Sequence, residues 1–264
     1  MPSGRLQQLA NAEDRFLGGP ADMFEPIGRL QLITLLRLGL EADSNVLDVG
    51  CGALRGGYWL IQFLDKSCYF GLEPNESMLR WGLSEVVGAT LSDAKAPRFS
   101  GTSDFDASEF GVRFDFWVAR SVWTHASIHQ IDAMLSSFAA TAKDDAVFLT
   151  SYLPASRDSG YEGTGWIGRS HESNEPGLVR YEPAQLTDVC AKYGLGIWRL
   201  QEDNLSQQWL VVEKGNGLAP VRSYLAPLAT LADVDHAPAE SFTKATLTAR
   251  VRALASRLLR RSGG

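Results

Sequence analysis

The 264-residue sequence is poor in cysteine, and the spacing of its cysteines excludes several kinds of site. Cys51, Cys68 and Cys190 are far apart, odd in number and form no C-x-x-C pair. The sequence therefore predicts neither a zinc site nor a disulfide framework. This cysteine usage favours a reducing compartment, so we expect a cytoplasmic protein. Residues 1–5 also lack the basic-then-apolar pattern of a secretory signal.

The sequence also lacks an excess of basic residues and any long apolar run. Its formal net charge is −6, whereas binding to nucleic acid normally calls for a basic stripe, so we expect no nucleic-acid partner. No apolar run approaches the ~20 residues of a membrane-spanning helix, so we expect no transmembrane segment. With 45% hydrophobic residues the chain has the composition and length of one globular domain with additions.

Helix and strand patterns alternate along most of the chain. Such alternation predicts an α/β fold with a parallel sheet and helices on both faces. Two closing segments, 196–200 and 208–213, have the pattern of a hairpin pair. The other expected strands lie near 45–49, 67–72, 97–101, 114–119 and 145–151, and expected helices lie within 5–40 and near 57–64, 76–87, 128–142 and 183–194.

The most informative stretch is a glycine loop after the first strand, within Val46–Gly57. It contains Gly50, Gly52 and Gly56, and glycine can take positive φ and let a ligand lie against the backbone. The spacing G-x-G-x-x-x-G is one residue longer than the dinucleotide fingerprint, and Arg55 stands where that fingerprint needs its third glycine. An ordinary Gly-rich turn between a strand and a helix would show the same residues.

This loop, with Asp48 two positions before its first glycine, resembles motif I of class I S-adenosylmethionine (SAM) dependent methyltransferases. In that family the loop wraps the amino-acid half of SAM. The next strand ends at Glu73, about 20 residues past the glycines, where a neighbouring parallel strand presents a carboxylate to a ribose. The resemblance gives Glu73 that role, and the alternative is a solvated carboxylate at a helix start. The resemblance implies SAM as cofactor, bound by Asp48, Gly50, Cys51, Gly52, Glu73 and Pro74.

The resemblance covers residues 40–215 and implies a Rossmann-like, seven-stranded, mostly parallel sheet whose last strand is antiparallel. We therefore expect a methyltransferase domain over residues 41–215. Residues 1–40 are expected to form a helical cover over SAM or a homodimer contact. Residues 216–264 are expected to be a linker followed by a basic amphipathic helix at 242–261. That helix would dock on the acidic domain or on a second subunit, or bind a membrane surface or another partner.

His125 is the candidate catalytic residue. It lies after the fourth strand, and Ser127 with Gln130 form a capping box that starts the next helix, so His125 falls in the loop at the strand's carboxyl end. A histidine there can accept the proton of an alcohol as the new bond to carbon forms. The alternative is a histidine bonded to loop carbonyls. Residues 114–125 resemble the family's fourth strand and the loop after it.

Arg120 and Ser121, in the same segment, are candidates for contact with the amino-acid end of SAM. Arg120 could equally pair with Asp48 or Glu73. The adenine would be held by Asp104 and Phe105, although neighbouring Asp106 is an equally good acceptor.

The acceptor atom is predicted to be oxygen. The positions after the fourth strand, 119–122, do not read Asn/Asp-Pro-Pro-aromatic, the motif of amide-nitrogen and nucleobase enzymes, and the chain has no Pro-Cys pair for carbon methylation. Alternatives are a nitrogen- or carboxyl-directed small-molecule methyltransferase, a non-catalytic SAM-binding protein and an NAD-dependent Rossmann protein. The loop spacing and the absence of a Tyr-x-x-x-Lys pair near the site argue against NAD.

Substrate choice is assigned to residues 152–180, a long Gly-rich segment that is expected to form a lid. Together with the fourth-strand segment it supplies four candidate substrate residues. The expected partner is a small molecule, such as a sugar or another hydroxylated metabolite. A divalent metal such as Mg²⁺ would need ligands like Asp158, His171 and Glu172, whose spacing matches no metal motif, so no metal site is predicted. The four candidate substrate residues are Trp123, Tyr152, Trp166 and His171.

Overall fold

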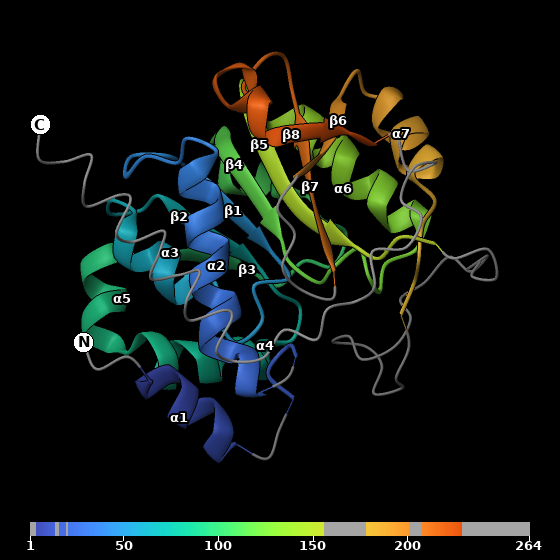
Figure 1. The fold of residues 1–264 in the computed structure, drawn as a ribbon. Coiled ribbons are helices and arrows are strands. Elements are labelled where there is room, and N and C mark those ends of the chain that lie inside the picture. Colours follow the sequence, from blue (N-terminus) through green and yellow to red (C-terminus); the bar gives the residue numbers. More distant parts are fainter. Residues whose placement is uncertain (1–3, 14–15, 20, 156–177, 201–206, 229–264) are drawn as a thin grey trace, which may run out of the picture. The chain divides into compact units, whose positions relative to one another are not determined.

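Figure 1 shows the fold in a computed structural model, which describes residues 4–13, 16–19, 21–155, 178–200 and 207–228. The chain divides into two units, Met1–Ala229 and Thr230–Gly264, and the second lies outside the described residues. The first unit is built on one eight-stranded sheet with the order β3-β2-β1-β4-β5-β7-β6-β8. The strands are β1 (Val46–Val49), β2 (Tyr69–Leu72), β3 (Arg98–Ser100), β4 (Phe114–Ala119), β5 (Ala142–Tyr152), β6 (Gly196–Leu200), β7 (Gln208–Glu213) and β8 (Leu225–Pro227).

The Rossmann-like α/β class predicted from the sequence is confirmed. β1 to β5 pair in parallel, and β7 is antiparallel to both β5 and β6. The strand count differs by one, because the short β8 pairs antiparallel with β6. The segment expected to be a linker therefore begins with a 3₁₀ helix, η4 (Ala219–Tyr224), and an edge strand. The segment of β8 has only three residues and ends in proline, so it is too short to show the alternating pattern that predicts a strand.

Helices cover both faces of the sheet (Figure 1). Successive strand residues point to opposite faces, so Val46 packs toward α2 and α3 while Leu47 packs toward α6 and α7. Both faces of the parallel strands are buried, and this explains their nearly continuous apolar sequence. None of the helices in the described ranges is long and apolar enough to cross a bilayer. The α-helices are α1 (Arg5–Ala12), α2 (Phe24–Arg37), α3 (Gly57–Phe63), α4 (Glu76–Trp81), α5 (Ala89–Lys95), α6 (Ile128–Thr141) and α7 (Pro183–Ala191). The chain also forms a π-helix, η2 (Gly82–Val87), and two short 3₁₀ helices, η1 (Ala21–Met23) and η3 (Ala107–Phe110).

Helix α2 packs unusually close to the glycine loop. A Cβ on Gly28 would lie 2.1 Å from the carbonyl oxygen of Arg55 and 3.0 Å from a ring carbon of Trp59. One turn further, a Cβ on Gly56 would meet the amide of Gln31 at 2.5 Å. Glycine at both contacts lets the helix backbone and the loop backbone touch, and so fixes the loop from behind.

Replacing Gly28 with alanine is expected to destabilise the protein by about 1–3 kcal/mol, because the new methyl group overlaps a backbone atom that cannot rotate away. The gain of up to about 1 kcal/mol in helix propensity offsets only part of this loss. Gly101→Ala is the matched control, since a Cβ there has nothing within 4 Å. Urea unfolding of both variants measures the difference; equal midpoints would show that the helix and loop can separate freely.

Candidate active site

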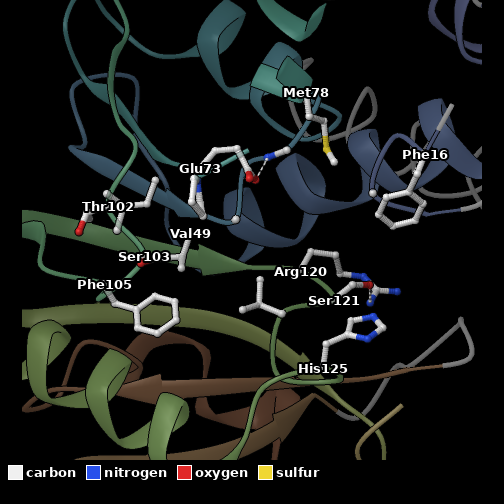
Figure 2. Close-up of a pocket in the computed structure, with 16 residues that line it drawn as sticks. Phe16, Val49, Glu73, Met78, Thr102, Ser103, Phe105, Arg120, Ser121 and His125 are labelled. Carbon is white, nitrogen blue, oxygen red and sulfur yellow. Dashed lines mark hydrogen bonds between the residues drawn. The ribbon is translucent and has the colours of Figure 1, made fainter. Parts of the chain in front are cut away.

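A cavity opens at the carboxyl ends of β1, β2 and β4, beside the point where the strand order turns from β1–β2–β3 to β4–β5 (Figure 2). Parallel α/β sheets bind ligands at this place. The cavity is open to solvent and encloses about 750 Å³ of space when its open mouth is included. Its lining comes from the glycine loop, Glu73–Pro74 with Met78, the 102–105 segment, the 120–125 segment and Phe16 with Gly18 near the amino terminus.

The glycine loop is folded back onto the end of β2. Gly50 and Gly52 have φ of 66° and 55°, which glycine adopts without strain. A Cβ on Gly50 would also approach Val122 Cγ2 to 2.9 Å. The Gly50 N–H donates to the carbonyl oxygen of Leu72 at 2.8 Å, so the loop is anchored to the neighbouring strand. The loop thus presents bare backbone to the cavity, as the sequence predicts.

Glu73 lies in the cavity wall and is held by two backbone groups. Its Oε2 accepts from the Gly52 N–H at 2.9 Å, and its Oε1 accepts from the Asn75 N–H at 2.8 Å. The side chain is buried, with 4% of its surface exposed, so the carboxylate has one fixed orientation. An ionised carboxylate has about four acceptor sites on its two oxygens, so it can accept more hydrogen bonds than these two.

Asp48 and Cys51 lie beneath the glycine loop and do not line the cavity, which corrects the expectation of direct cofactor contact. The Tyr69 hydroxyl donates to Asp48 at 2.7 Å. Burial raises the pKa of Asp48 to about 7, although the bond from Tyr69 and the charge of Arg55 oppose this shift. Burial also raises the pKa of the Cys51 thiol and lowers the pKa of Arg55 to about 10. These groups support the loop from below.

The raised pKa of Asp48 predicts a pH-dependent stability. The folded protein holds a proton on Asp48 up to about pH 7, whereas the unfolded chain releases it near the ordinary value of 3.8. Between these values the folded state binds more protons, so this group's contribution to stability is complete below about pH 4 and is lost as the pH rises through 7. The full loss is on the order of 4 kcal/mol.

Asp48→Asn removes this titration and keeps an oxygen that accepts from Tyr69. We therefore expect the variant to gain stability relative to the wild type as the pH rises from 4.5 to 8. Urea unfolding of both proteins at the two pH values measures the change. A difference between the two proteins that is the same at both pH values would contradict the raised pKa.

The 102–105 segment places Phe105, not Asp104, in the cavity (Figure 2). Phe105 has φ of 65°, a strained value for a side-chain-bearing residue, and this turn directs its ring inward. Asp104 is exposed and accepts from Thr102 Oγ1 at 2.5 Å and from the Asp106 N–H at 3.0 Å. The Thr102 bond lowers the pKa of Asp104. Asp104 thus closes the turn and is not among the residues that line the cavity.

His125 reaches the cavity through the local structure that the sequence predicts. The Ser127 side chain accepts from the Gln130 N–H at 3.2 Å, and the Gln130 side chain accepts from the Ser127 N–H at 2.9 Å. This capping box starts α6 at Ile128 and leaves His125 in the preceding turn. In Figure 2 the imidazole lies at the same end of the cavity as Arg120 and Ser121.

Arg120 and Ser121 belong to a hydrogen-bonded network. Arg120 Nη1 donates to the hydroxyls of Ser121 and Ser151, each at 3.0 Å, and its guanidinium lies 5.0 Å from the centre of the Trp209 ring. Gln207 bonds to both serine hydroxyls. Sequence reasoning missed Ser151, Gln207 and Trp209, because the pairing of β5 with β7 brings them to the Arg120–Ser121 turn from distant positions and no motif marks them.

Two of the four candidate substrate residues lie in the core and not in the cavity, so we withdraw them. Trp123 is fully buried and packs edge-on against Phe148, with ring centres 5.8 Å apart. Tyr152 is fully buried, and its hydroxyl donates to Gln208 at 3.2 Å. The strand-and-turn pattern predicts that these residues lie at or beyond a strand end, but it does not tell which side of the turn faces a ligand.

The other two candidates, Trp166 and His171, lie outside the described residues, as do Asp158 and Glu172 and most of the expected lid. Phe16 and Gly18 line the cavity and were not singled out from the sequence. Within the ranges that the structure describes, no three His, Cys, Asp or Glu side chains gather as metal ligands would.

The sequence profile of the family described as "Methyltransferase domain" matches residues 23–200, which is more than half of the chain. The chain belongs to this methyltransferase family. The predicted membership of the class I SAM-dependent methyltransferases is thereby confirmed.

Solved methyltransferase structures share the fold. The magnesium protoporphyrin IX methyltransferase from Synechocystis with bound SAM has a TM-score of 0.53 and 16% identity, over 81% of this chain and 92% of that one. An amino pentose methyltransferase from Micromonospora echinaspora, also with bound SAM, has a TM-score of 0.54 and 14% identity, over 78% of this chain and 94% of that one. A putative O-methyltransferase from Nostoc punctiforme has a TM-score of 0.55 and 16% identity, over 79% of this chain and 60% of that one.

Proposed function

We propose that this methyltransferase transfers the methyl group of SAM to a hydroxyl oxygen of a small molecule, with His125 as general base. The observation that carries the proposal is the shared cavity. One hollow at the strand ends contains the bare glycine loop, the oriented carboxylate of Glu73 and the imidazole of His125. These are the groups that binding of an adenosyl cofactor and removal of a proton require.

The residues present fit SAM. Gly50 and Gly52 present backbone at positive φ with no side chain, and the two held oxygens of Glu73 suit a ribose diol. Phe105 offers a buried ring for the adenine, in place of Asp104. Arg120 and Ser121 lie at the opposite end, where we assign the amino-acid half. Two solved structures with this fold contain SAM, which supports the assignment.

Bound SAM supplies a methyl group on a positively charged sulfur, already activated for displacement. The chain must hold the acceptor oxygen in line with the bond between the methyl carbon and the sulfur, and it must remove the proton of the acceptor hydroxyl. An alcohol is a poor nucleophile while protonated, so an imidazole within hydrogen-bond reach of the hydroxyl raises the rate by roughly 10²–10⁴-fold. Phe16 and Val122 make this end of the cavity partly apolar, which helps to exclude water.

The acceptor that we propose is a sugar or another hydroxylated metabolite. The likeness in fold to an amino pentose methyltransferase supports a small polar acceptor. A nitrogen- or carboxyl-directed reaction is the alternative. The cytoplasmic location and the homodimer remain predictions from the sequence, and we propose no metal.

The test is methyl transfer from methyl-labelled SAM to a panel of sugars, phenols, amines and carboxylic acids, with products identified by mass spectrometry. We expect label in a methyl ether. Label confined to amines or carboxylates would replace the oxygen-directed proposal with its alternative. Calorimetry with S-adenosylhomocysteine (SAH) and with NAD separates the cofactors, and binding of NAD alone would refute the methyl-transfer proposal.

A further inference from the structure

Behind the His125 end of the cavity, Ser151 and Trp209 contact Arg120, and Gln207 bonds to Ser151; none of these three residues lines the cavity. Ser151 is near the end of β5, Gln207 directly precedes β7, and Trp209 is within β7, which pairs with β5 in antiparallel register at Ser151 and Trp209. The sheet therefore fixes the positions of all three relative to one another.

The Ser151 hydroxyl is the centre of this network. It accepts from Arg120 Nη1 at 3.0 Å and from the Ser121 N–H at 2.9 Å, and it donates to Gln207 Oε1 at 2.8 Å. A serine hydroxyl has one donor and two acceptor lone pairs, so these bonds use its full capacity. Ser151 has 0% of its surface exposed. A buried, fully bonded hydroxyl of this kind determines where its partners point.

The turn that carries Arg120 into the cavity depends on the same hydroxyl. Ser121 has φ of 62°, a strained backbone conformation for a residue with a side chain. This conformation directs the Ser121 N–H to Ser151 Oγ. Loss of the hydroxyl would leave that N–H without its acceptor, and an unsatisfied group of this kind is costly when buried.

The guanidinium of Arg120 is held in one orientation by its neighbours. Nη1 directs its bonds to the two serine hydroxyls, and the Trp209 ring supports the guanidinium from one side at 5.0 Å. The side chain keeps 7% of its surface exposed, yet it lines the cavity. A planar guanidinium whose orientation is fixed binds a carboxylate with little loss of conformational freedom. Among the described residues that line the cavity, Arg120 is the one Arg or Lys.

We propose that Ser151 is the positioning residue of an anion-binding subsite at Arg120, and that this subsite takes a carboxylate at the His125 end of the cavity. The inference rests on the proposed function, which places SAM in the same cavity. Two molecules present there can supply the carboxylate: the methionine portion of SAM, or the methyl acceptor.

Calorimetry distinguishes the two sources. The probes are SAH and the SAH analogue in which hydrogen replaces the carboxylate, each titrated into wild type, Ser151→Ala, Ser151→Thr and Arg120→Lys. Ser151→Thr keeps the hydroxyl, whereas Arg120→Lys keeps the positive charge but loses the planar guanidinium. The matched control is Thr150→Val, which removes a buried hydroxyl bond to the Ala119 carbonyl at the adjacent position of β5. A second titration adds 4-hydroxybenzoate to protein saturated with SAH.

If the methionine carboxylate occupies the subsite, the wild type binds SAH about 10–100-fold more tightly than the analogue. This preference falls below about 3-fold in Ser151→Ala and Arg120→Lys and persists in Ser151→Thr and Thr150→Val. If the acceptor supplies the carboxylate, SAH and the analogue bind alike, and 4-hydroxybenzoate binding shows the same pattern of loss and retention.

Two results would overturn the inference: a carboxylate preference that either Ser151→Ala or Arg120→Lys leaves unchanged, or no carboxylate dependence for either probe. Arg120→Lys keeps the test decisive if Ser151→Ala does not fold. In both overturning results SAH still binds, so the proposed function stands. Failure of the wild type to bind SAH at all would instead refute the proposed function.

Discussion

Replacing His125 with alanine is expected to lower the turnover of methyl transfer by roughly 10²–10⁴-fold, with the affinity for SAH unchanged. The reason is positional. His125 lies in the turn before α6 at the Arg120 end of the cavity, away from Phe105 and Thr102, so it is placed to meet the acceptor and not the adenosine. Single-turnover kinetics with labelled SAM measure the chemical step, and calorimetry with SAH measures binding.

His129→Ala is the matched control for this experiment. His129 is exposed on the first turn of α6, four residues from His125 and outside the cavity, so its removal tests for general effects on the helix start. We expect normal turnover from it. If His125→Ala also turns over normally, the general base is another group, and His125 serves only the loop.

Replacing Glu73 with glutamine is expected to weaken SAH binding by at least ~100-fold, because hydrogen bonds from a ribose diol to a carboxylate are stronger than those to a neutral amide. The amide also disturbs the site itself. One of its two ends is an NH₂ group, which cannot accept, so either the Gly52 N–H or the Asn75 N–H loses its partner. Calorimetry with SAH gives the affinity, and thermal unfolding reports the loss of the backbone bond.

Glu76→Gln provides the comparison. Glu76 is at the start of α4, three residues further along, and its carboxylate is exposed and bonded to Arg80 at 2.8 Å. We expect its removal to change SAH affinity by less than about 2-fold, since exposed ion pairs contribute little. Equal effects of the two substitutions would mean that general charge near the cavity, and not the oriented carboxylate of Glu73, attracts the ligand.

Much of the fold could be predicted from the sequence because its signals are local. Most of the strands are apolar runs whose period and length identify them, and those at the centre of the sheet are buried on both faces. The capping box at Ser127 and Gln130 marks the start of α6 to the residue. The prediction missed α5, a short helix with no fully buried residue, whose Leu91 packs partly buried against the core, and it missed β8, which is three residues long.

Within the candidate site, the sequence by itself determined the residues at the ends of the parallel strands. Gly50, Gly52, Glu73 and His125 follow the parallel strands β1, β2 and β4, and parallel strands bring their carboxyl ends to one edge of the sheet, so these residues meet there. Which side chains of a strand end or turn face the ligand could not be predicted in this way, because a turn directs neighbouring residues to opposite sides.

The tertiary structure alone decided those orientations. It places Asp48 beneath the loop, where burial raises its pKa, and it places Trp123 in the core while His125, two residues later, reaches the cavity. It also brings Ser151 to Arg120 across 31 positions of sequence. Such contacts depend on strand register and on the packing of distant segments, which no local pattern of residues encodes.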